Sequence, residues 1–204
     1  MKILVFSDIH SDLRALQKLM EIDAGHYFAA GDMVSWARGL DAVGPILQRR
    51  APNVWVIPGN HESERNITDL CDRYGLRNFH GQTTKLDGFH IAGLGYSNIT
   101  PFDTPGEYPE SEFKTHLSGF AALSPLIMVC HCPPKSTKLD RAGEGKHFGS
   151  PAVRDFIEQH QPYYFFCGHI HEAEGSIDTI GRTVAVNVGK RGYLLDLAKI
   201  EVKT

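Results

Sequence analysis

Short apolar runs alternate with amphipathic stretches along the first third of the chain. Mainly apolar runs, which indicate buried strands, cover residues 2–7, 27–30 and 53–57. Apolar residues at helical spacing predict helices between and after these runs, at residues 13–20 behind the capping pair Ser11-Asp12, at 38–50, and at 64–74 before Gly75. The order β-α-β-α-β-α predicts parallel strands joined by right-handed crossover helices.

The remaining two thirds carry a looser pattern. Further strands are expected at residues 90–94, 126–130 and 163–167, and helices at 111–122 and 150–160. Two polar stretches predict loops near a functional site: residues 95–112, which hold three prolines, and the Gly-rich residues 135–149, which we expect to be mobile. Residues 175–202 contain three β-type runs around Gly181 and Gly192, which predict a meander that supplies a second sheet.

A polar cluster follows each of five predicted strands. Its members are Asp8, His10, Asp32, Asn60, His61, His131, His169 and His171. Ligands of α/β proteins bind outside the carboxyl ends of the strands, and carboxylate, imidazole and amide groups are ligands of divalent metals. One apolar residue separates Asp8 from His10 and His169 from His171, so both members of each pair should point the same way along an extended strand. The set is too large for one ion and suits two ions that share a carboxylate.

Bulk properties narrow the class of protein. The 204 residues are 42% hydrophobic and 22% charged, which suits one compact domain, and we expect residues 1–204 to form it. The net charge of −3 and the pI of about 6.4 argue against nucleic acid as the main partner. No apolar stretch approaches the roughly 20 residues of a membrane helix, so we expect a cytoplasmic protein without a membrane partner. The four cysteines fit neither a disulfide framework nor a zinc finger and are expected to be reduced, buried thiols.

The order of these motifs resembles that of the calcineurin-like metallophosphoesterases, whose pattern is Asp-x-His, Gly-Asp, Gly-Asn-His, a lone His and Gly-His-x-His. The matching segments are Asp8-Ile9-His10, Gly31-Asp32, Gly59-Asn60-His61, His131 and Gly168-His169-Ile170-His171. Each single motif is weak evidence, but all five occur in order, each behind an apolar run. The resemblance covers residues 3–171 and extends to Asn187-Val188-Gly189.

The resemblance implies an α/β fold of four layers, an αββα sandwich of two mixed β-sheets flanked by helices. It also implies two divalent ions, chosen among Mn, Fe, Zn, Co and Ni, with Mn favoured. Asp8, His10 and His171 would hold one ion, Asn60, His131 and His169 the other, and Asp32 would bridge them. A metal-bridging hydroxide would attack phosphorus in line. His61 would contact the phosphate and protonate the leaving oxygen as general acid.

The chain departs from the family pattern at two places, of which the first bears on the substrate. Ser35-Trp36 stands where the protein-phosphatase branch has Asp-Arg, which argues against a phosphoprotein phosphatase, and Lys190 replaces the serine of the Asn-Pro-Gly-Ser motif of some branches. We therefore expect a phosphodiesterase of the small bacterial and archaeal type, acting on a small phosphate ester. A phosphomonoesterase, a pyrophosphatase, a nuclease and a non-catalytic scaffold of the same fold are the alternatives.

Candidates for substrate binding lie outside the motifs. Asn98 could reach the site or cap a turn, and His147 could touch substrate from the Gly-rich loop. Arg141 belongs to a basic cluster, with Lys135, Lys138 and Lys146, which is either a solvated loop or a rim that attracts phosphate. No role is predicted for Glu62, which could simply start the next helix.

Overall fold

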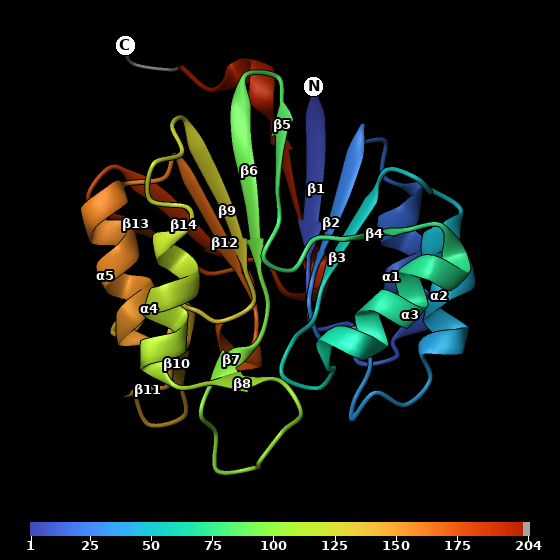
Figure 1. Cartoon of the computed structure of the whole chain (residues 1–204), viewed down its shortest axis with the longest axis horizontal. Coiled ribbons are helices and arrows are strands. Elements are labelled where there is room, and N and C mark those ends of the chain that lie inside the picture. Colours follow the sequence, from blue (N-terminus) through green and yellow to red (C-terminus); the bar gives the residue numbers. More distant parts are fainter. Residues whose placement is uncertain (202–204) are drawn as a thin grey trace.

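Two β-sheets pack face to face, and helices cover both outer sides (Figure 1). The computed structural model describes residues 1–201. In the first sheet the strand order is β15 (Tyr193–Asp196), β1 (Lys2–Phe6), β2 (His26–Ala30), β3 (Val54–Ile57) and β4 (Arg77–Asn78). In the second sheet it is β13 (Ile177–Ile180), β14 (Thr183–Asn187), β12 (Tyr164–Cys167), β9 (Leu126–Cys130), β6 (Phe89–Leu94) and β5 (Thr83–Leu86).

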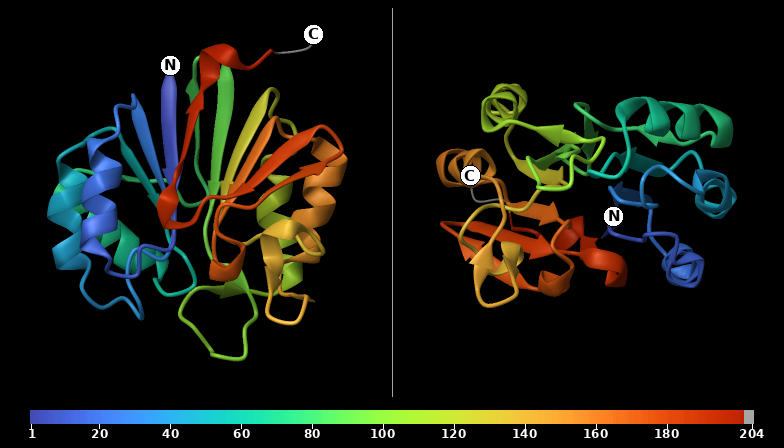
Figure 2. Two further views of the ribbon diagram at one scale, coloured as in Figure 1. Left: turned by 180° about the vertical axis from the view of Figure 1, so that it is seen from behind. Right: turned by 90° about the horizontal axis from the view of Figure 1, so that it is seen from below.

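Both sheets are parallel in their middle; the first is antiparallel at one edge and the second at both edges. β15 runs antiparallel to β1, and β13 and β5 run antiparallel to their neighbours in the second sheet. The first sheet is covered by α1 (Leu13–Glu21), α2 (Leu40–Gln48) and α3 (Glu64–Tyr74), and the second by α4 (Glu110–Ser118) and α5 (Pro151–His160) (Figure 2). This arrangement confirms the expected four-layer sandwich of two mixed sheets.

The core consists of three apolar layers. One lies between the two sheets, and one lies between each sheet and the helices that cover it. In β1, Leu4 and Phe6 face the α1–α3 layer, whereas Ile3 and Val5 face the layer between the sheets. A third cluster, which includes Phe113 and Phe156, packs α4 and α5 against the second sheet. Because alternate side chains of a central strand enter different layers and both are dry, these strands are apolar without interruption.

Helix ends follow local capping chemistry. The Asp12 side chain accepts a hydrogen bond from Ala15 N (3.0 Å) at the start of α1. Ser63 and Asn66 form a reciprocal capping box at the start of α3, and Gly75, with φ of 66°, ends that helix. These signals can be recognised in the sequence because each cap and its partner are at most four residues apart.

The C-terminal strands depart from the predicted meander. β13 and β14 form a hairpin in the second sheet, but β15 crosses over and pairs with β1 in the first. The connection runs through the short 3-10 helix η3 (Gly189–Arg191) and Gly192, whose φ of 70° turns the chain. A local pattern indicates a strand but not its partner, which explains the error.

Both predicted loops contain regular structure. Residues 95–112 hold a small parallel pair, β7 (Ser97–Asn98) and β8 (Glu107–Tyr108), and the start of α4. Residues 135–149 hold the 3-10 helix η1 (Lys138–Asp140) and a hairpin of β10 (Arg141–Ala142) and β11 (Lys146–His147). The loop predicted at residues 135–149 is present and contains these short elements. Among the described residues, no helix combines the length and apolar character needed to span a bilayer.

Candidate metal centre

The predicted metal-binding residues gather where β1, β2, β3, β9 and β12 end, at the edge of the two sheets that lies lowest in Figure 1. They do not lie on the strands themselves. β1 stops at Phe6, and Asp8 and His10 follow it with φ of 54° and 44°. Asp32 and His169 are also left-handed, with φ of 54° and 71°.

We predicted that the two members of each pair point the same way because they alternate along an extended strand, but they lie beyond the strands. Asp8 and His10 reach one site through tight turns, and His171 begins the 3-10 helix η2 (His171–Ala173). Ile9 and Ile170 are buried between them as expected. A non-glycine residue with positive φ costs of order 1 kcal/mol or more, and such strain concentrates at functional sites.

Three overlapping triads each bring their ligand atoms within 4.8 Å of one another. The triads are Asp8, His10 and His171; His10, Asp32 and His61; and Asp32, His131 and His169. Asp32 Oδ2 lies 3.6 Å from His10 Nε2 and 3.4 Å from His131 Nε2. This shared carboxylate therefore lies between the two groups that the resemblance assigns to two different ions.

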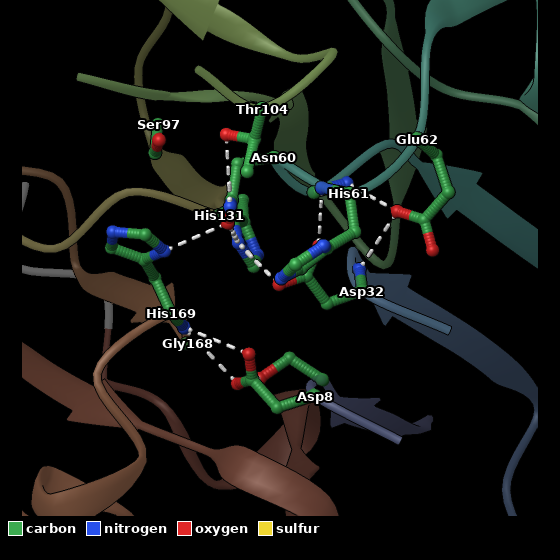
Figure 3. A network of polar contacts seen from close by, with 12 residues as sticks. Asp8, Asp32, Asn60, His61, Glu62, Ser97, Thr104, His131, Gly168 and His169 are labelled. Atoms are coloured by element: carbon green, nitrogen blue, oxygen red, sulfur yellow. Dashed lines mark hydrogen bonds and ion pairs between the residues drawn. The ribbon is translucent and has the colours of Figure 1, made fainter. Parts of the chain in front are cut away.

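The amide of Asn60 is oriented by a residue that the sequence did not single out. Asn60 Nδ2 donates to Thr104 Oγ1 at 3.2 Å, which turns Oδ1 toward the histidines (Figure 3). Oδ1 lies 3.2 Å from His131 Nε2 and 2.9 Å from His169 Nδ1. Thr104 comes from the loop between β7 and β8, 44 residues away, and no local signal connects the two.

Hydrogen bonds outside the cluster fix the buried ligands. His131 Nδ1 donates to the carbonyl oxygen of Ala30 at 2.9 Å, so Nε2 faces Asp32 and Asn60. Asp8 accepts from the backbone N–H of His169 at 3.0 and 3.1 Å and from the Ser7 hydroxyl. Such bonds orient metal ligands and select the imidazole nitrogen that faces the ion.

Electrostatics favour a cation at this place. Burial opposes charge on Asp8, but the hydrogen bond with His171 and the nearby His131 hold the pKa of Asp8 below its usual value. Burial also opposes charge on His131, yet the Asp32 carboxylate raises the pKa of His131 to about 9. Burial and His131 lower the pKa of His169 to about 4, which leaves its lone pair free. Carboxylates, neutral imidazoles and an amide oxygen form a donor set that fits two divalent ions, and metal would displace the proton held by His131.

Glu62, to which the sequence assigned no role, is buried and joins two turns that carry candidate metal ligands. Its Oε2 accepts hydrogen bonds from the backbone N–H groups of Asp32 (3.1 Å) and Gly59 (2.9 Å) (Figure 3), and its Oε1 accepts from that of Val34 (3.0 Å). Burial and the charge of Asp32 raise the pKa of Glu62 to about 8. The turns after β2 and β3 are thus joined by one side chain.

His61 lies at the edge of the centre with its ring oriented by Trp36. The backbone N–H of Trp36 donates to His61 Nδ1 at 3.3 Å, so the neutral ring carries its proton on Nε2. The Trp36 and His61 rings meet edge to face at 5.5 Å. Ser35 Oγ lies 2.9 Å from His10 Nδ1. Ser35 and Trp36, noted in the sequence only as departures from a family pattern, therefore contact two site histidines.

A cavity of about 600 Å³ opens from this centre. Asp32, Asn60, His61, His169 and His171 line its inner end. Asn98 and His147, two of the three predicted substrate-binding residues, also line it, and so does Lys135. Arg141, the third, lies on β10 and is not among the lining residues.

Asn187 holds the turn that carries His169. Its Nδ2 lies within hydrogen-bond distance of the carbonyl oxygens of Gly168 (3.2 Å), Ile170 (3.0 Å) and Leu139 (3.1 Å). The late Asn-Val-Gly motif, to which the sequence assigned no role, thus positions a predicted ligand from the end of β14.

Comparisons with known proteins find relatives of this chain. The family model described as calcineurin-like phosphoesterase matches residues 1–173. MJ1162, an uncharacterized protein of Methanocaldococcus jannaschii, is 31% identical over 201 residues, which are 96% of this chain and 91% of that protein.

Solved structures share the fold. A structure titled as a novel archaeal phosphodiesterase has a TM-score of 0.54 at 16% identity and covers 98% of this chain and 96% of its own. A dimetal phosphatase from Danio rerio has a TM-score of 0.61 at 12% identity and covers 92% of this chain and 86% of its own.

Proposed function

This chain belongs to the calcineurin-like phosphoesterase family, and we propose that it hydrolyses phosphodiesters with the help of two divalent ions. Asp8, His10 and His171 would hold one ion and Asn60, His131 and His169 the other, with Asp32 in contact with both. When bound, the ions would neutralise phosphoryl oxygens and acidify a water molecule for attack at phosphorus. Manganese is the first ion to test, because the mixed nitrogen and oxygen donors accept it.

The chain's own residues supply the remaining chemistry. Water attacks phosphorus, the bond from phosphorus to the leaving oxygen breaks, and that oxygen needs a proton unless it is a stable anion. His61 lines the cavity beside Asp32, and because its Nδ1 accepts from Trp36, Nε2 is the ring nitrogen free to contact the phosphate. A general acid must be the doubly protonated ring, so we propose that His61 protonates the leaving oxygen from Nε2 as an imidazolium, in which Nδ1 no longer accepts from Trp36.

The preference for diesters rests on the charge of the cavity. Among the described residues that line it, Lys135 is the one lysine and no arginine occurs. A phosphomonoester carries two negative charges and a diester one, so a monoester needs more cationic groups besides the metals. A cavity lined by a single lysine suits the less charged ester.

The test compares bis(4-nitrophenyl) phosphate with 4-nitrophenyl phosphate, which release the same phenolate, on protein reconstituted with Mn²⁺, Zn²⁺, Co²⁺, Ni²⁺ or Fe²⁺. We expect kcat/KM for the diester to exceed that for the monoester by at least tenfold. Asp32→Asn should lose both activities, which excludes a contaminating phosphatase. A monoester cleaved much faster than the diester would overturn the preference, and no hydrolysis of either would favour a scaffold.

A further inference from the structure

The outer end of the cavity is apolar, although it opens to solvent. Ile99, Phe102 and Phe148 line it with exposed fractions of 63%, 71% and 48%. Seven large apolar side chains are exposed in the described part of the chain, and three of them are these. Single exposed apolar residues are ordinary, but a cluster at the mouth of a cavity marks a binding surface. We call Ile99, Pro101, Phe102 and Phe148 the apolar rim.

The rim is assembled from two segments far apart in sequence. Ile99, Pro101 and Phe102 belong to the loop between β7 and β8, and Phe148 follows β11. The β7–β8 loop and the β10–β11 hairpin project from the same edge of the molecule in two opposite views (Figures 1 and 2). This edge also carries the metal centre, so the rim and the centre share one cavity.

A carboxylate anchors the first rim segment. Glu107, on β8, accepts hydrogen bonds from the backbone N–H groups of Thr100 (3.1 Å) and Thr104 (2.9 Å). It also accepts from the hydroxyl of Thr100 at 2.5 Å. The backbone N–H of Phe102 donates in turn to Thr100 Oγ1 at 3.2 Å. Phe102 therefore stands on a loop that is hydrogen-bonded on both sides of it.

A second carboxylate anchors Phe148 in the same manner. The buried side chain of Asp140 accepts from His147 Nδ1 (2.7 Å) and from Gly149 N (2.9 Å). The backbone N–H of Phe148 itself donates to the Asp140 carbonyl at 3.2 Å. Three consecutive residues are thus tied to one aspartate, and the backbone that carries the exposed ring is held in place before any ligand binds. Such preorganisation lowers the entropic cost of binding.

We propose that the apolar rim binds a planar aromatic group of the substrate, such as a nucleobase, while the ester's phosphate lies at the metal centre; this inference rests on the proposed function. A cavity of about 600 Å³ is far larger than a phosphate and falls within the range of sites for whole small molecules. Aromatic rings at the rim offer stacking faces, which bind any base with little regard to its identity. The substrate class is therefore a nucleoside-type phosphodiester, not a purely alkyl one.

The experiment uses product-like ligands, so that binding is measured apart from turnover. Adenosine 5′-monophosphate and methyl phosphate are titrated calorimetrically into Mn²⁺-loaded protein. We expect the nucleotide to bind at least tenfold more tightly, and Phe102→Ala/Phe148→Ala to remove that preference while the affinity for methyl phosphate stays the same. Phe102→Tyr should keep the preference. Leu194→Ala, an exposed apolar position on β15 away from the cavity, is the matched control.

Each outcome decides one of the two proposals. Equal affinities for the two ligands in the wild-type protein, or a preference that survives in the double variant, would overturn the role of the rim. If diester hydrolysis continues in that case, the proposed function still stands. A strong nucleotide preference in a protein that hydrolyses no phosphodiester would instead support the rim and overturn the proposed function.

Discussion

His61 can act as a general acid only as an imidazolium, in which Nδ1 is protonated and no longer accepts from Trp36 N–H. A general acid contributes most when the leaving group is poor, because a good leaving group departs as an anion. We expect His61→Ala to slow hydrolysis of alkyl diesters at least tenfold more than that of 4-nitrophenyl diesters, measured as kcat on each series. Equal losses on both would mean that His61 acts only by contacting the phosphate.

Glu62 offers a second test at the scale of a residue. Replacement by glutamine keeps the size of the side chain but supplies only one acceptor oxygen to the three backbone N–H groups that now converge on it. A buried donor without a partner costs about 1–3 kcal/mol. We expect Glu62→Gln to lower the free energy of unfolding by that amount. It should also weaken metal binding, because the turns that carry Asp32 and Asn60 lose hydrogen bonds that join them.

Urea denaturation and metal titration measure these two effects. Glu64→Gln is the matched control, since Glu64 is an exposed glutamate only two positions further along the chain. A Glu62→Gln protein as stable as the wild type would contradict the bracing role.

At the scale of elements, sequence reasoning succeeded where the determinants are local. β9 has the predicted bounds 126–130, and α3 ends at Gly75, because an apolar run or a cap is complete within a few residues. It missed β4 and β5, which are short and partly exposed and carry few apolar residues. The partner of β15 was also wrong, since pairing depends on the whole sheet.

In the candidate site, too, some residues could be predicted from the sequence and others could not. The motif residues could be found from sequence because each follows a strand and their order matches a family. Glu62, Thr104 and Asn187 could not be assigned roles, because their partners lie 3 to 48 residues away and bond mainly through backbone groups. A hydrogen bond to a backbone group does not depend on which residue supplies that group, so the sequence does not reveal it.

His80 joins three elements and should make stability depend on pH. It lies between β4 and β5, its Nδ1 accepts from Gly95 N (3.0 Å) beyond β6, and its Nε2 lies 3.1 Å from the Tyr108 hydroxyl on β8. Burial and the neighbouring His116 lower the pKa of His80 to about 4. The unfolded chain therefore binds this proton more tightly than the folded one, and stability is lost as the pH falls from about 6.5 toward 4.

The full effect of His80 would be about 3 kcal/mol over that interval. We expect His80→Asn to be less stable than the wild type at pH 7 but to lose less stability between pH 7 and pH 5, in urea denaturation of metal-free protein. His160→Asn, at an exposed helix end, should follow the wild-type curve. Parallel pH curves for wild type and His80→Asn would exclude His80 as the titrating group.

At the scale of the whole molecule, the candidate metal centre lies across the junction of the two sheets. Asp8, Asp32 and Asn60 follow strands of the first sheet, whereas His131 and His169 follow strands of the second. Away from the centre, the sheets are joined mainly by the apolar layer between them. Bound ions would therefore link the two halves of the fold at the end where acidic and imidazole groups replace that layer.

This placement predicts that metal stabilises the global fold as well as the site. A ligand that binds only the folded state at a hundred times its Kd adds about 2.7 kcal/mol per site, which for a chain of this size raises Tm by roughly 5–10 °C. We expect that rise when Mn²⁺ is added to chelator-treated protein, measured by calorimetry. Asp32→Asn should lose most of it, because Asp32 contacts both groups of ligands. His61→Ala, which removes the proposed acid, and Asp155→Asn, an exposed change on α5, should keep it. An unchanged Tm would show that the ligands do not bind the ion, whereas a rise that Asp32→Asn retains would mean that the ions bind without a shared carboxylate.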